Sequence, residues 1–95
     1  MLGIVPKTGK LISEKPAQQA KRALSNLKLL ATKNGFKLQH AIKCNLYLTN
    51  MADFVEVNQV YAEFFKEDLP ARTTVAVQAL PLGANFEIEA VFFKP

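Results

Sequence analysis

Arg72 is the residue of this sequence best suited to bind an anion. It follows Pro70 and Ala71 at the start of an apolar stretch, where the proline restricts the backbone. A guanidinium offers a planar pair of N–H donors that matches a carboxylate with two parallel hydrogen bonds. We expect Glu87 and Glu89 on the neighbouring strand, where they can pair with Arg72 or orient a water for attack on a bound substrate. The residues alone leave both interpretations open.

Other side chains that commonly carry catalysis are scarce. The chain has one histidine, His40, and one cysteine, Cys44, which cannot supply the four ligands of a structural zinc site. His40 has no partner of its kind nearby and fits a structural or surface role. Cys44 falls on the apolar face of a predicted strand, which favours a core role over that of a nucleophile. There is no glycine-rich phosphate loop, no nucleophile elbow and no Cys/His cluster, so we expect no metal.

The composition fits a single folded domain over residues 1–95. Of these residues 49% are hydrophobic and 21% charged, and no apolar run approaches the roughly 20 residues that span a bilayer. A membrane partner is therefore not expected. Residues 1–6 are too short and uncharged for a secretory signal. The single cysteine indicates a reducing compartment, either the cytoplasm or the mitochondrial matrix.

The net charge of +4 is unevenly distributed along the chain. Residues 1–43 hold nine Lys or Arg and one acid, whereas residues 44–95 hold three Lys or Arg and seven acids. Such an asymmetry can indicate a nucleic-acid surface, a head-to-tail oligomer or a solvated helix face. Residues 7–33 contain no aromatic side chain on which a base could stack, so nucleic acid is not the expected partner.

Periodic patterns predict two helices and three main strands, preceded by a turn and a short extended piece at residues 5–13. The expected elements are a helix from Pro16 to the Asn-Gly pair at 34–35, a strand at 41–49, a helix capped by Asn50 and reaching Phe64, and strands at 72–80 and 85–93. The first strand alternates, with Ile42, Cys44, Leu46 and Leu48 expected on the core face. The segment PLGAN is expected to form a short hairpin-like loop between the last two strands.

Helices on one face of a mixed sheet form the natural two-layer solution for this order of elements. The other sheet face would then carry Glu87, Glu89, Val91 and Phe93. Such a face is too apolar to stay in water, which predicts that sheets of neighbouring subunits pack together.

The two stretches YLTNMADFVEVNQVYAEFF and PARTTVAVQALPLGANFEIEAV resemble the Rid (YjgF/YER057c/UK114) family of reactive-intermediate deaminases. The family's C-terminal signature is matched without a gap from Pro70 to Ala90. The segments PKTGKL and NLKLLATKNG are similar to the family as well, so the resemblance covers essentially the whole chain.

The resemblance implies an α+β fold of the chorismate-mutase-like (ferredoxin-like) type, with two helices on one face of a mixed sheet and a homotrimer around a central barrel. It implies hydrolysis of 2-imino and enamine acids to 2-keto acids and ammonia in a cleft between subunits, without cofactor or metal. By resemblance, Arg72 holds the substrate carboxylate and Glu87 positions the attacking water. Asn58 lines the site, and Thr74 stands where some members carry a cysteine.

The chain departs from the family at its start. Family members open with a hairpin ending in Ser-Gly directly before the segment similar to MLGIVPKTGKL, so we expect the fold without that first hairpin. An unpaired sheet edge and a reduced deaminase activity are expected to follow. The alternative is a non-catalytic trimer that binds a carboxylate ligand or regulates another process. RNA binding or ribonuclease activity is a less favoured alternative.

Overall fold

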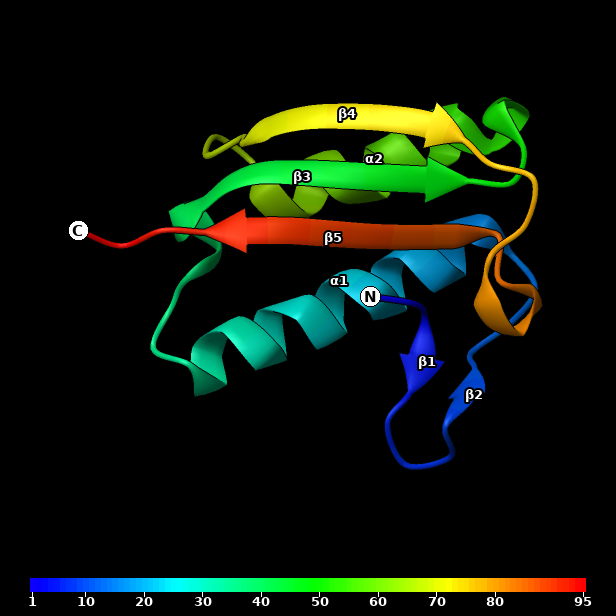
Figure 1. Cartoon of the computed structure of the whole chain (residues 1–95), viewed down its shortest axis with the longest axis horizontal. Helices are drawn as coiled ribbons and strands as arrows, with labels where there is room; N and C mark the ends of the chain where they lie inside the picture. Colours follow the sequence, from blue (N-terminus) through cyan, green and yellow to red (C-terminus); the bar gives the residue numbers. More distant parts are fainter.

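A three-stranded mixed sheet with two helices on one face makes up most of the molecule (Figure 1). The structure is a computed structural model that describes all residues 1–95. Its elements are β1 (Ile4–Val5), β2 (Lys10–Leu11), α1 (Pro16–Lys33), β3 (Ala41–Leu48), α2 (Phe54–Phe65), β4 (Ala71–Ala76) and β5 (Phe86–Phe92). The strand order is β4-β3-β5, with β3 parallel to β4 and antiparallel to β5. The predicted α+β fold is confirmed, and neither helix has the length and apolar character needed to cross a membrane.

Helix α1 begins and ends where the sequence predicts, whereas α2 begins at Phe54, after a 3₁₀ turn that follows the predicted Asn50 cap. Pro16 occupies the first turn of α1, where its missing N–H is not needed, and Gly35 adopts a positive φ of 80° just after the helix. Asn50 accepts a hydrogen bond from the Ala52 N–H at 3.0 Å, which caps the short 3₁₀ turn leading into α2. The apolar faces of both helices pack against the sheet, where thirteen buried residues form one core cluster.

The core face of β3 contains Cys44, Leu46 and Leu48, all fully buried. The prediction that Ile42 shares this face is wrong, because its side chain is 52% exposed and Ala41 is buried instead. A register shift between Ala41 and Lys43 explains the difference, since one extra residue in a strand exchanges the two faces before it.

The prediction of a hairpin between the last two strands is also wrong. β3 lies between β4 and β5, so the PLGAN segment carries the chain across the end of the sheet (Figure 1). Asn85 fixes this crossing, because its N–H donates to Gln19 Oε1 at 2.8 Å and its side chain donates to the Glu14 carbonyl at 2.9 Å. Arg72 and the glutamates of β5 are therefore not neighbours across a hairpin.

Residues 1–11 form an arm with a two-stranded hairpin that lies against α1 and pairs with the outer edge of β5, so the predicted unpaired sheet edge is covered in part. The Ile88 N–H donates to the Met1 carbonyl at 3.0 Å, and the Asn26 side chain donates to the Ile4 carbonyl at 2.8 Å. Gly3 is packed so tightly that a Cβ there would lie 2.5 Å from the Gln19 carbonyl oxygen. The position therefore accepts only glycine without moving the arm.

Candidate functional site

Arg72 lies on the helix side of β4, because its register partner on β3 is the buried Cys44. Its guanidinium sits over two rings of α2, with the carbon Cζ 4.8 Å from the centre of Tyr61 and 5.4 Å from that of Phe54. Arg72 Nη1 also donates a hydrogen bond to Asn58 Oδ1. The three α2 residues are spaced by four and three positions, which places them on one face of the helix under the arginine.

The charge of Arg72 is not neutralised within the chain. The one ion pair of the structure joins the Met1 amine to Glu87, with 3.6 Å between nitrogen and Oε2. The partners of Arg72 are a neutral amide and two ring faces, and its side chain is exposed. Rings and an amide orient a guanidinium without satisfying all of its five N–H donors. The first interpretation from the sequence, an internal ion pair between Arg72 and Glu87 or Glu89, is therefore wrong. The second remains, because the guanidinium is free to bind an anion from outside the chain.

Beneath Arg72, the Cys44 thiol and the Tyr61 hydroxyl form a neutral, buried layer. Burial raises the pKa of Cys44, and the Tyr61 hydroxyl and the Arg72 charge offset this only in part. Burial also raises the pKa of Tyr61 well above its usual range. The Tyr61 hydroxyl oxygen is shielded from solvent and lacks a hydrogen-bond partner of good geometry. The core role predicted for Cys44 is confirmed, since the residue is fully buried.

Thr74 lies two residues beyond Arg72 on the same edge strand. The Val77 N–H donates to the Leu48 carbonyl at 2.7 Å, so alternate residues of β4 point their backbone groups towards β3. The intervening residues, Arg72 and Thr74, therefore direct their N–H groups towards the free edge of the sheet. The Thr74 hydroxyl itself is shielded from solvent and unpaired. The Thr74 N–H, rather than the hydroxyl, is thus the polar group of this residue that faces the open edge of the sheet.

Two open hollows flank the Arg72 side chain. One, of about 540 Å³, is lined by Met51, Ala52, Phe54, Val55, Arg72 and Thr74. The other, of about 390 Å³, is lined by Asn58, Tyr61, Ala62, Leu69, Pro70 and Arg72. Both have room for a small organic acid whose carboxylate contacts the guanidinium.

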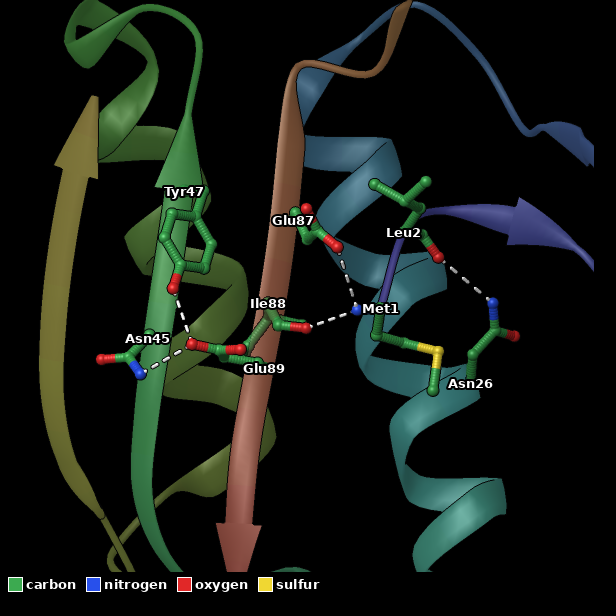
Figure 2. A network of polar contacts seen from close by, with 8 residues as sticks. All are labelled: Met1, Leu2, Asn26, Asn45, Tyr47, Glu87, Ile88 and Glu89. Carbon is green, nitrogen blue, oxygen red and sulfur yellow. Dashed lines mark hydrogen bonds and ion pairs between the residues drawn. The ribbon is translucent and has the colours of Figure 1, made fainter. Parts of the chain in front are cut away.

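Glu87 lies elsewhere in the molecule. Its register partner on β3 is Tyr47, on the face of the sheet turned away from the helices, and its nearest charged group is the Met1 amine (Figure 2). The Met1 amine also donates to the Ile88 carbonyl at 2.6 Å. Within one chain the structure brings together Arg72, Asn58 and Thr74, while Glu87 is on the opposite face with β3 in between.

The outer face also carries a polar network that sequence reasoning missed. Glu89 Oε1 accepts hydrogen bonds from the Tyr47 hydroxyl at 2.6 Å and from the Asn45 side chain at 2.9 Å (Figure 2). The Tyr47 and Asn45 donors lower the pKa of Glu89, and the bond to Glu89 raises the pKa of Tyr47. The alternation of inward and outward side chains along β3 and β5 indicated that these residues share the outer face. Only the strand order shows that β3 and β5 are neighbours, so that the residues can bond to one another.

The ring platform below Arg72 was also missed, although its signal was present. Phe54, Asn58 and Tyr61 recur at helical spacing, and knowledge that β4 packs on α2 would have placed them under the arginine. No group of three or more His, Cys, Asp or Glu side chains is arranged to hold a metal ion. The arrangement suits carboxylate binding.

Comparisons with known proteins agree with this architecture. The profile of a family described as "Endoribonuclease L-PSP" matches residues 1–93. A RutC family protein of Pyrococcus horikoshii is 41% identical over 91 residues, covering 96% of this chain and 72% of that protein. The human 2-iminobutanoate/2-iminopropanoate deaminase is 38% identical over 90 residues, covering 95% of this chain and 66% of that protein. The crystal structure of E. coli TdcF with bound serine superimposes with a TM-score of 0.92 at 31% identity, covering 99% of this chain and 76% of that one.

Proposed function

This chain belongs to the endoribonuclease L-PSP family, which includes the Rid (YjgF) proteins, and on that premise we propose that it hydrolyses 2-imino and enamine acids to 2-keto acids and ammonia. The observation that carries the proposal is Arg72, a charged guanidinium without an acidic partner at the lip of two hollows. The human relative is named for deamination of short 2-imino acids, and the E. coli structure is described with the amino acid serine bound.

Arg72 and the edge of β4 supply the carboxylate site. The guanidinium donates two parallel N–H groups to one carboxylate, and the Thr74 N–H at the free edge adds a third donor. Asn58 and the two rings hold the arginine in place before the ligand arrives, which reduces the entropy lost on binding. A 2-imino acid bound in this way presents its C2 carbon close to the sheet edge.

Glu87 can act on the same substrate only if it comes from another copy of the chain. Arg72 and Glu87 lie on opposite faces of one sheet, so a small acid cannot touch both within a single chain. We therefore place the site between subunits of a homotrimer, with Arg72 from one copy and Glu87 from the next. The outer face supports such an assembly, since Val75, Val91 and Phe93 are 40%, 52% and 61% exposed there.

The reaction needs orientation and one proton shuttle. Glu87 accepts a proton from water as the water oxygen adds to C2 of the protonated imine, which gives a carbinolamine. The same carboxyl group returns the proton to nitrogen, the C–N bond breaks and ammonia leaves. The hydroxyl proton passes to the Glu87 carboxylate as the carbonyl of the 2-keto acid forms, and from there to the departing ammonia. Arg72 keeps the acid fixed throughout, so the attacking water meets C2 in a near-attack geometry.

A carboxylate-binding trimer without turnover is the second candidate. The observation that favours it is the separation of Glu87 from Arg72, which lie on opposite faces of the sheet with β3 in between. Such a protein would bind 2-keto acids beside Arg72 and leave imines to hydrolyse at the buffer rate.

Freshly generated 2-iminobutanoate separates these candidates. We expect 2-ketobutanoate to form faster with the protein than in buffer alone, and Arg72→Ala to lower kcat/KM about tenfold to a hundredfold, as expected for loss of a charge-assisted pair. Arg22→Ala is the matched control, because Arg22 bonds Asn26 on α1 and is remote from both hollows. If the protein binds 2-keto acids but the imine hydrolyses no faster than in buffer, the carboxylate-binding trimer without turnover replaces the deaminase proposal.

A further inference from the structure

Gln19 of α1 is the one polar residue among the buried residues of the chain, with 0% of its surface exposed. Its Nε2 donates to the Ser13 carbonyl at 2.8 Å, and its Oε1 accepts from the Asn85 N–H at 2.8 Å. Burying an amide costs free energy unless it is hydrogen-bonded, and both polar atoms of this amide are bonded. The side chain thereby joins the loop before α1 to the start of β5.

Asn85 extends this network to the end of the sheet. Its side chain donates to the Glu14 carbonyl at 2.9 Å, and its carbonyl accepts from the Thr49 N–H at 3.3 Å. The Thr49 hydroxyl donates to Asn85 Oδ1 at 2.9 Å. β5 begins at the next residue, and Glu87 follows two positions after Asn85. The place of Glu87 along the sheet is therefore set where these bonds converge.

The backbone of Gln19 also supports the arm that lies beside Glu87. Gly3 packs against it so closely that a Cβ on Gly3 would lie 2.6 Å from the Gln19 Cα. Leu2, the preceding residue, forms a β-bridge with Glu87 on the outer edge of β5 (Figure 2). Two routes, one through Asn85 and one through the arm, thus connect Gln19 to Glu87.

The connection between β4 and β5 makes an anchor at this point necessary. The chain reaches β5 through residues 77–85, in which Leu82 is 66% exposed and has a positive φ of 61°. Exposed irregular segments are more mobile than the elements that they connect. The bonds at Asn85 separate this mobility from Glu87.

We propose that Gln19 is a positioning residue for Glu87, which it holds in place through the start of β5 without contacting the substrate. The inference rests on the proposed function, in which Glu87 steers water onto C2 of an imine bound to Arg72 of another copy. A misplacement of about 1 Å slows such a step about a hundredfold. The buried side chains of Phe86 and Ile88 fix which face of the sheet carries Glu87. Its exact position along the strand depends on the anchor.

Two substitutions at Gln19 test the inference. Gln19→Met keeps a side chain of similar length and removes both hydrogen bonds. Gln19→Glu keeps both bonds while its carboxyl group is protonated, because the C=O accepts and the O–H donates as the amide does. Ala31→Gly is the matched control, since it destabilises the same helix at a buried position outside this network.

Imine turnover and 2-keto-acid binding are measured for each folded variant. We expect Gln19→Met to lower kcat for 2-iminobutanoate about tenfold and to leave the Kd for 2-ketobutanoate within about twofold, because Arg72 lies on the other face of the sheet. At about pH 6, where burial keeps the new carboxyl group protonated, Gln19→Glu should retain most of the wild-type kcat. Ala31→Gly should leave kcat and Kd within about twofold of wild type.

A kcat of Gln19→Met equal to that of Ala31→Gly would overturn the inference, as would a Gln19→Glu variant as slow as Gln19→Met at about pH 6. NMR of the Glu87 carboxyl carbon reports its position without turnover. We expect its signal to change in Gln19→Met and to stay as in wild type in Ala31→Gly. If wild type shows no turnover, a changed signal in Gln19→Met retains the anchor and removes the deaminase. An unchanged signal overturns the inference whatever the turnover.

Discussion

The buried hydroxyl of Tyr61 allows the ring below Arg72 to be tested apart from the polar group it carries. Tyr61 is 3% exposed, its hydroxyl has no hydrogen bond of good geometry and only the weak Cys44 thiol beside it, and its ring centre lies 4.8 Å from the guanidinium carbon. Tyr61→Phe removes the hydroxyl and keeps the ring. Tyr61→Leu removes both. The two variants therefore separate stability from ligand binding.

The expected changes have opposite directions. A buried polar group without a partner costs about 1–3 kcal/mol, so Tyr61→Phe should raise the free energy of unfolding by about 1 kcal/mol after the loss of the oxygen's packing contacts. For a domain of this size that corresponds to about 4–8 °C in Tm. Tyr61→Leu should weaken 2-keto-acid binding by about twofold to fivefold, because a cation–π contact near the surface is worth about 0.5–1 kcal/mol.

Urea unfolding at one fixed protein concentration measures the first effect, since an oligomer's apparent stability depends on concentration. Calorimetric titration with 2-ketobutanoate measures the second. A loss of more than about 1 kcal/mol in Tyr61→Phe would show that the hydroxyl has a stabilising partner and would refute the reasoning. Equal ligand affinities of the phenylalanine and leucine variants would show that the ring does not orient Arg72.

Three further changes test other parts of the structure. Gly3→Ala should lower the free energy of unfolding by about 1–3 kcal/mol in a urea titration, because its Cβ would meet the Gln19 backbone; wild-type stability would show that the arm can shift freely. Tyr47→Phe should raise the pKa of Glu89, followed by NMR of its carboxyl carbon, because it removes a donor that lowers this pKa. Glu89 has a lower pKa in the folded chain than in the unfolded chain, so this contact stabilises the fold above the unfolded pKa. The stabilisation is lost as the pH falls through the folded pKa. The difference in free energy of unfolding between wild type and Tyr47→Phe should therefore close in acid. Glu87→Gln should reduce imine turnover while leaving 2-keto-acid binding within about twofold, because the amide cannot accept a proton from water; unchanged turnover would assign the proton transfer to another group.

The elements of the fold could be predicted because their signals are local. Pro16, the Asn-Gly pair at 34–35 and the Asn50 cap mark helix ends through their own backbone preferences. The order of strands could not be read from the residues in the same way. PLGAN has the composition of a hairpin loop, yet β3 occupies the position between the strands it joins.

The error in strand order carried over into the site. Arg72 was found from its residue type and its place after Pro70, both visible in the sequence. Its partners were not, because a neighbouring β5 would have offered glutamates, whereas α2 offers Asn58 and two rings. The exchange of Ile42 for Ala41 in the core has a similar origin, since the bulge that causes it depends on pairing with β5.

The most direct test of a site shared between copies is complementation by mixed subunits. Arg72→Ala and Glu87→Gln chains are unfolded together in equal amounts and refolded, and imine turnover is compared with each variant refolded alone. If every cleft takes Arg72 from one copy and Glu87 from the next, random mixing should restore both residues in about a quarter of the clefts, and turnover should return to about that fraction of wild type. Turnover that stays at the level of the separate variants, with mass spectrometry showing mixed oligomers, would contradict a site built from two chains.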